Sequence, residues 1–182
     1  VWCPVSNLFM FNTTMKVKKM LGHGVSVSLG TDSTHTGGAN LFEEMAYARK
    51  VYREMYHEEL PAKTLFNMVT ANPAKALRVD HRAGKLHQGF DADVYIADLI
   101  KEDPFENLLA LGPEHGRVLL RDGKLVYGND GLQEMLPTFS EMTSVKVNTQ
   151  EKTIAGDPVM LLNRIREKVG FSKEFTFLPL TL

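Results

Sequence analysis

The start of the chain alternates between strand-like and helix-like patterns of apolar residues. Residues 1–5 form a short apolar run that is typical of a buried strand, and residues 13–21 carry apolar side chains at helical spacing. Residues 25–29 alternate apolar and small polar side chains, which is the period of a strand. Because a crossover helix between two strands implies that they are parallel, the pattern predicts an α/β fold.

Helices are predicted to follow this strand–helix–strand segment. Asn40 and Glu43 have the spacing of a capping box, so we expect a helix that begins after Asn40 and reaches about His57. Pro61 suits the first position of the next helix. Asn72 is expected to cap a further short helix. The apolar positions within these helices predict a face that packs on the core.

The pattern changes after Gly84, where short strands follow one another with little helix between them. Residues 94–97, 118–120 and 145–147 are rich in apolar and β-branched side chains and are predicted to be strands. Asp122-Gly123 has the composition of a two-residue hairpin turn. Such a run indicates an antiparallel layer that is separate from the preceding α/β part.

The composition narrows the class of protein without naming a function. The chain has 182 residues and a net charge of −1, with 43% hydrophobic and 24% charged residues, so nothing indicates a nucleic-acid or membrane partner. No apolar stretch approaches the ~18 residues of a spanning helix. With a single cysteine, Cys3, an intrachain disulfide is excluded. We expect a cytoplasmic protein, and the uncapped apolar start indicates a chain that lacks its front.

Asp32 is the strongest candidate for a catalytic residue. It lies in the sequence Leu-Gly-Thr-Asp-Ser at residues 29–33, where the predicted strand meets its loop. In barrels of parallel strands, catalysis takes place at this C-terminal edge. A carboxylate there can bind a metal and accept the proton of a metal-bound water. The alternative is a helix or turn cap, because Thr-Asp-Ser-Thr is also favourable capping sequence.

Four short motifs in a fixed order resemble those of the amidohydrolase superfamily. The chain is most similar to the branch that holds the cytosine and guanine deaminases and the triazine hydrolases. The resemblance covers roughly residues 1–127. The motifs are Cys3-Pro4-Val5-Ser6-Asn7, Leu29-Gly30-Thr31-Asp32-Ser33, Thr70-Ala71-Asn72-Pro73-Ala74, and Gly84-Lys85-Leu86 followed by Gly89-Phe90-Asp91-Ala92-Asp93.

The resemblance implies the organisation of the whole chain. Residues 1–83 would form the last βα units of a TIM-type barrel. Residues 84–156 would form part of a small β-sandwich domain, and residues 157–182 a C-terminal helix with an apolar tail. The expected fold class is therefore α/β with an added antiparallel part.

The resemblance also implies roles for a few residues. Asp32 would be the aspartate at the end of barrel strand eight, acting as metal ligand and general base. Ser6 and Asn7 would shape the turn after strand seven. The metal would be divalent, with zinc expected first and iron as the alternative. Its histidine ligands would lie upstream of this chain, whose own histidines form no metal-binding pattern.

Candidate substrate-binding residues surround Asp32 in the sequence. Ser33 and His35 lie in the same loop, and Asn7 lies in the preceding turn. A lone histidine is more often simply exposed to solvent, so this alternative stays open for His35. Cys3, within an apolar run, is expected to be an unreactive packing residue.

The expected activity of the parent enzyme is hydrolysis of a non-peptide C–N bond in a small, possibly cyclic, substrate, with ring deamination the leading form. One alternative is a non-catalytic fragment that needs a missing N-terminal half. Another is a metal-free module that binds a small ligand. The expected partners are a small-molecule substrate and either that missing half or further copies of the chain.

Overall fold

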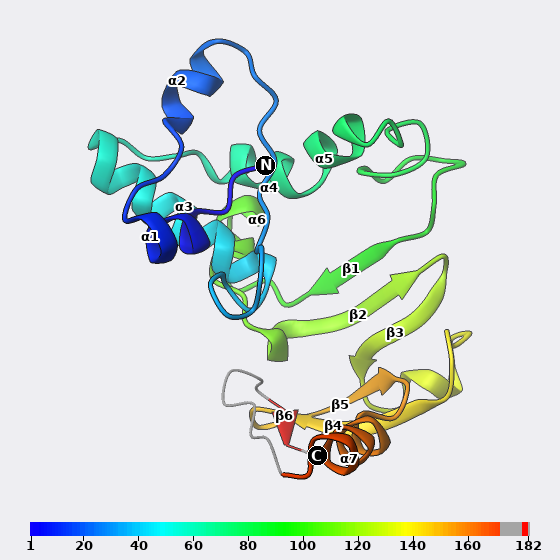
Figure 1. The fold of residues 1–182 in the computed structure, drawn as a ribbon. Helices are drawn as coiled ribbons and strands as arrows, with labels where there is room; N and C mark the ends of the chain where they lie inside the picture. The colour runs from blue at the N-terminus through cyan, green and yellow to red at the C-terminus, as the bar shows by residue number, and fades with distance from the viewer. Residues whose placement is uncertain (172–179, 182) are drawn as a thin grey trace. The chain divides into compact units, whose positions relative to one another are not determined.

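A computed structural model describes residues 1–171 and 180–181 of the chain (Figure 1). The chain divides into two compact units. Unit 1 comprises residues 1–90 and 99–110, and unit 2 comprises residues 91–98 and 111–182. None of the described helices is long and apolar enough to cross a membrane. The predicted domain boundaries after residues 83 and 156 stay predictions.

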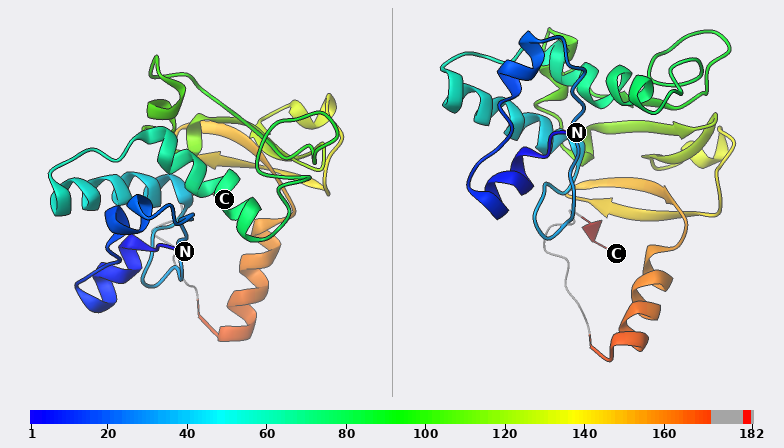
Figure 2. Two further views of the ribbon diagram at one scale, coloured as in Figure 1. Left: turned by 90° about the horizontal axis from the view of Figure 1, so that it is seen from above. Right: turned by 45° about the horizontal axis from the view of Figure 1, so that its top comes forward.

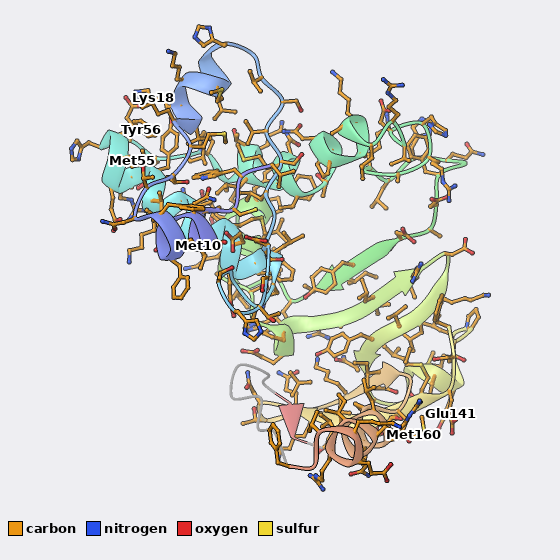
Figure 3. The ribbon with its side chains drawn as sticks, in the orientation of Figure 1. Met10, Lys18, Met55, Tyr56, Glu141 and Met160 are labelled. Atoms are coloured by element: carbon orange, nitrogen blue, oxygen red, sulfur yellow. The ribbon has the colours of Figure 1, made fainter. Side chains whose placement is uncertain are left out.

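Unit 1 is mainly helical. Its helices are α1 (Pro4–Phe11), α2 (Val17–Gly22), α3 (Leu41–Tyr56), α4 (Ala62–Val69), α5 (Ala71–Ala76) and α6 (Pro104–Leu108). Helices α1 and α2 both contact α3, as Figures 1 and 2 show. Lys18 on α2 lies beside the end of α3, where its ammonium is 5.8 Å from the centre of the Tyr56 ring (Figure 3). The same ammonium forms a 2.7 Å ion pair with Glu58.

The two strands predicted at the start of the chain are much shorter than expected. Each contributes one bridge residue, because Trp2 pairs with Leu29 in the parallel direction. The Trp2 N–H donates to the Ser28 carbonyl at 2.7 Å, and the Gly30 N–H donates to the Trp2 carbonyl at 3.0 Å. The first strand ends early because Pro4, which suits a helix N-terminus, already opens α1. The parallel direction is as predicted, and the TIM-type barrel stays a prediction.

Local capping signals explain where α3 begins and ends. The side-chain oxygen of Asn40 accepts a 3.0 Å hydrogen bond from the Glu43 N–H, which confirms the predicted cap. In a full capping box the Glu43 side chain would accept from the Asn40 N–H. Here the Glu43 carboxylate accepts from the Ala39 N–H instead. Helix α3 ends at Tyr56, and the C-cap residue His57 has a left-handed backbone with φ 54°.

Two predicted helix starts need correction. Pro61 is the residue before α4 and not its first helical residue. Asn72 lies inside α5, where its side chain caps nothing. Its amide donates a 2.7 Å hydrogen bond to the Val27 carbonyl. The side chain therefore ties α5 to the extended segment before Asp32.

The core of unit 1 lies between α3, α4 and the extended segments. It is centred on fully buried apolar side chains. Those with almost no exposed surface include Trp2, Val17, Met45, Ala48, Leu60, Leu65 and Met68. The indole of Trp2 also donates a 2.7 Å hydrogen bond to the Thr14 hydroxyl, so its polar atom is paired.

Unit 2 contains an antiparallel sheet with the strand order β1-β2-β3-β5-β4-β6. The strands are β1 (Val94–Ala97), β2 (Gly116–Arg121), β3 (Lys124–Asn129), β4 (Met142–Val147), β5 (Gln150–Ala155) and β6 (Leu180–Thr181). Two 3-10 helices, η1 (Pro113–His115) and η2 (Leu132–Glu134), lie between them in sequence. The described strands form one sheet, so the β-sandwich stays a prediction.

The predicted hairpin turn joins β2 to β3. Asp122 has φ 50° and Gly123 has φ 72°, the left-handed pair that a two-residue turn of this kind requires. Arg121 and Lys124 pair directly across it. Strand β5 was not predicted, because its sequence is mostly polar although Lys152 and Thr153 are buried.

The C-terminal helix is present as predicted. Helix α7 (Pro158–Val169) begins after Asp157, whose carboxylate accepts a 2.8 Å hydrogen bond from the Met160 N–H. None of its residues is buried by the described part of the chain. Figure 2 shows α7 projecting away from the strands that precede it. Most of the predicted apolar tail lies outside the described residues.

Candidate functional site

Asp32 lies in the loop that follows the parallel bridge of Trp2 and Leu29. Its backbone has φ 58°, a left-handed conformation that is uncommon for residues other than glycine. Its side chain is exposed, and its Oδ2 accepts a hydrogen bond of 2.6 Å from the hydroxyl of Ser6. The carboxylate oxygen Oδ2 is thus bound by Ser6 of α1. The described residues donate no hydrogen bond to the other oxygen, Oδ1.

Ser6 connects Asp32 to a second residue of the same loop. Its side chain is buried on α1, and its Oγ lies 3.0 Å from the Oγ1 of Thr36. Because the single hydroxyl proton of Ser6 points to the carboxylate, Thr36 is the donor in the second contact. The two hydroxyl groups therefore orient the Asp32 carboxylate from inside the protein.

Glu44 is a buried carboxylate near this network that the sequence analysis did not select. Its Oε1 accepts from the Val5 N–H and its Oε2 from the Gly38 N–H, both at 3.1 Å. Burial raises the pKa of Glu44, and the two N–H groups partly oppose that shift. One signal was present in the sequence. Glu44 lies four residues before Ala48 and seven before Val51, on the face of α3 that packs into the core.

Cys3 lies beside the same carboxylates. Partial burial raises the pKa of its thiol, and the negative charges of Asp32 and Glu44 raise it further. The reactive form of a cysteine is the thiolate, so a raised pKa makes Cys3 a poor nucleophile. The direction of this shift agrees with the expectation that Cys3 is unreactive.

The three predicted substrate-binding residues lie in the same region. Asn7 is on α1, and its Oδ1 accepts a 3.1 Å hydrogen bond from the Thr14 hydroxyl. Ser33 and His35 are exposed in the Asp32 loop, where the Ser33 hydroxyl accepts a 3.2 Å hydrogen bond from the His35 N–H. Their roles toward a substrate stay predictions.

The described residues do not form a complete metal site. Among them, no group of three or more histidine, cysteine, aspartate or glutamate side chains could hold a metal ion. A catalytic zinc site normally has three protein ligands and a water. Asp32 could supply one ligand, so the remaining ligands would have to come from outside the described part of the chain.

Comparison with known proteins shows that the chain belongs to the amidohydrolase family, whose profile matches residues 1–149. A 5′-deoxyadenosine deaminase of Methanosarcina mazei is 35% identical over 133 residues, which cover 68% of this chain and 30% of that protein. A 5-methylthioadenosine/S-adenosylhomocysteine deaminase of Acetivibrio thermocellus is 31% identical over 159 residues, which cover 81% of this chain and 36% of the relative. The family resemblance seen in the motifs is thereby confirmed.

Solved structures share the fold. Guanine deaminase of E. coli matches with a TM-score of 0.61 and 24% identity over 70% of this chain and 33% of its own. A zinc-bound adenosine deaminase from Xanthomonas campestris matches with a TM-score of 0.71 and 20% identity. The match covers 92% of this chain and 36% of the deaminase. At these identities the likeness concerns the fold alone. The chain spans only about a third of the length of the proteins it matches.

Proposed function

We propose that this chain is the C-terminal part of a metal-dependent deaminase that hydrolyses a C–N bond of a small ring substrate. The observation that carries the proposal is the position of Asp32 in a chain of the amidohydrolase family. Its carboxylate stands in the loop that follows a parallel bridge, and Ser6 holds one of its oxygens at 2.6 Å. The other oxygen is left for a ligand or a proton.

This arrangement supports a catalytic role for Asp32. A bound divalent metal, zinc or alternatively iron, would supply an activated water. Asp32 Oδ1 would accept a proton and later return it to the leaving amine, which is general acid–base catalysis. The Ser6 and Thr36 hydroxyl groups limit rotation of the carboxylate. Ser33, His35 and Asn7 would contact the substrate from the same loop and from α1.

The relatives suggest the substrate class. Their names specify 5′-deoxyadenosine, 5-methylthioadenosine and S-adenosylhomocysteine, all of which contain an adenine nucleoside. We therefore propose an adenine nucleoside as substrate, with ammonia as one product. Guanine and triazine rings are the alternatives, since enzymes for both share the fold.

The surface of α1 supports the view that further protein surrounds this chain. Phe9, Met10 and Phe11 are consecutive residues of α1 with 71%, 53% and 64% of their surface exposed. Figure 3 shows Met10 on this helix. A contiguous exposed apolar surface usually marks a contact with another protein surface. An N-terminal barrel half is the partner that we propose.

A second candidate concerns the isolated chain. Because the described residues contain no group of three metal-binding side chains, the 182 residues alone are proposed to be a non-catalytic part of the enzyme. A metal-free module that binds a small ligand is the remaining alternative. Metal analysis of the isolated chain and of the full-length protein separates these two alternatives. For a non-catalytic part of the enzyme, stoichiometric zinc or iron is expected only in the full-length protein.

The direct test is ammonia release by the full-length protein and by its Asp32→Asn variant. The full-length protein is expected to deaminate 5′-deoxyadenosine or 5-methylthioadenosine. Asp32→Asn should lower turnover by about 10²- to 10⁴-fold, the usual contribution of a general base. Asp80→Asn, at another exposed aspartate, is the matched control. No ammonia from any adenine, guanine or triazine substrate would refute the proposal, and full turnover by Asp32→Asn would remove Asp32 from it.

A further inference from the structure

Glu44 is buried without an ionic partner. Its side chain has 0% exposed surface, and in the described part of the chain no ion pair involves it. A carboxylate in such a place is strongly unfavourable unless it is hydrogen-bonded. The two backbone N–H groups that donate to Glu44 therefore offset part of the cost of burying its carboxyl group.

The first of these N–H groups belongs to the start of α1. Val5 lies in the first turn of that helix, whose N–H groups have no partner within the helix. The side chain of Cys3, the residue before the helix, accepts no capping hydrogen bond. The Oε1 of Glu44, which lies on α3 and 39 residues after Val5, accepts the hydrogen bond of the Val5 N–H instead. Hydrogen bonds to a carboxylate are roughly twice as strong as those between neutral groups.

The second N–H group closes the loop that carries Asp32. Gly38 donates to Glu44 Oε2, and a Cβ at position 38 would lie 2.8 Å from that oxygen. A side chain at position 38 would therefore force the Glu44 carboxylate to shift. The loop also contacts α1 through Ser6, which follows Val5 and bonds to Asp32 at 2.6 Å and to Thr36 at 3.0 Å.

We propose that Glu44 is a positioning residue that clamps the Asp32 loop to the start of α1. Its two oxygens hold Val5 and Gly38, and the hydroxyl contacts of Ser6 with Asp32 and Thr36 lie between those two points. Glu44 thus acts on Asp32 through Ser6 and the loop backbone. The inference rests on the function proposed for Asp32 where it concerns catalysis, although the clamp itself does not.

The variants Glu44→Gln and Glu44→Ala test the clamp. Glutamine keeps the volume of the side chain and one carbonyl oxygen, so it separates loss of a hydrogen bond from loss of packing. Glu54→Gln is the matched control, because Glu54 lies on the same helix with 62% of its side chain exposed. If the alanine variant fails to fold, the glutamine variant still gives the answer.

The first readout is amide hydrogen exchange of this chain, followed by NMR. We expect the Val5 amide, the Gly38 amide or both to exchange about 10- to 100-fold faster in Glu44→Gln. Amides in the middle of α3 and α4 should keep their rates. Unchanged exchange at both sites would overturn the clamp. A uniform acceleration of all amides in unit 1 would also overturn it, since it would show a purely stabilising role.

The second readout is the steady-state kinetics of the full-length protein. Glu44→Gln should lower kcat by about 10²-fold with little change in KM, because a small misplacement of a catalytic group has such an effect. A kcat equal to that of Glu54→Gln would overturn the link between Glu44 and Asp32. If the wild-type protein deaminates nothing while the exchange pattern appears, the proposed function fails and the clamp stands.

Discussion

Gly37 is the residue of the Asp32 loop where a single added methyl group should have the largest effect. A Cβ at this position would lie 1.6 Å from the Thr31 carbonyl oxygen and 2.7 Å from its carbon. Both neighbours are backbone atoms, so no side chain can move aside. The Gly37 N–H also donates a 2.7 Å hydrogen bond to the Ser33 carbonyl, which closes a turn directly after Asp32.

The size of the effect follows from the distances. Real Cβ atoms are essentially never closer than 3.0 Å to such neighbours, so Gly37→Ala must move the two sides of the loop apart by about 1.4 Å. Overpacking of this kind typically lowers the free energy of unfolding by about 1–3 kcal/mol. A displacement of ~1 Å at a catalytic group can lower activity about 10²-fold. Both effects are expected together, because the loop carries Asp32.

Tryptophan fluorescence gives a clean assay of the stability change. The chain has one tryptophan, Trp2, which is fully buried in unit 1. Its urea transition should shift to lower concentration by about 1 M in Gly37→Ala. Gly22→Ala is the control, since a Cβ there meets nothing within 4 Å. Equal urea midpoints for the two variants would refute the packing described for this loop.

Two further predictions concern pH. Because burial and neighbouring carboxylates raise the pKa of Cys3, its alkylation rate should still increase above pH 9.0, and a plateau below that value would contradict the arrangement. Burial lowers the pKa of Lys152, so the unfolded chain binds this proton more tightly than the folded one. The free energy of unfolding should therefore rise as pH approaches 10.5, the ordinary lysine value. Urea unfolding followed by circular dichroism should show a smaller rise in Lys152→Met, and parallel slopes would count against a buried ammonium.

Elements that depend on local chemistry could be predicted from the sequence. The cap of α3 at Asn40 needs only the residues that follow it, and the turn at Asp122-Gly123 needs only two left-handed residues. Asp157 caps α7 in the same local way. In each case the side chain and its backbone partner are a few residues apart, so a short window of sequence contains the whole interaction.

Elements that depend on distant partners could not be predicted. Asn72 looks like a helix cap in sequence, yet its side-chain amide donates a hydrogen bond to the carbonyl of Val27, 45 residues earlier. Strand β5 has a mostly polar sequence, yet the side chain of Lys152 is buried. Its ammonium donates to the Gly116 carbonyl and to the side-chain oxygen of Asn129, both at 2.8 Å. No local pattern reports such long-range pairing.

The candidate site likewise contains one residue that its local sequence indicates and one that depends on distant partners. Asp32 could be selected as a candidate because a carboxylate after a strand has a recognisable sequence context. Glu44 was missed because its two partners, Val5 and Gly38, meet it only when three segments come together. Attention to a charged residue on the apolar face of α3 would have selected it. The roles of Asn7, Ser33 and His35 toward a substrate still await a test.

The strand order of unit 2 has a consequence for how the chain folds. Strands β2 and β3 are hairpin neighbours, as are β4 and β5, so two of the five described strand pairings join residues close in sequence. Hairpins of this kind form within about 1–10 μs. Unit 1 instead depends on joining Trp2 to Leu29 and α1 to α3. Such distant closures are slower, so the Asp32 loop should become ordered later than the two hairpins of unit 2.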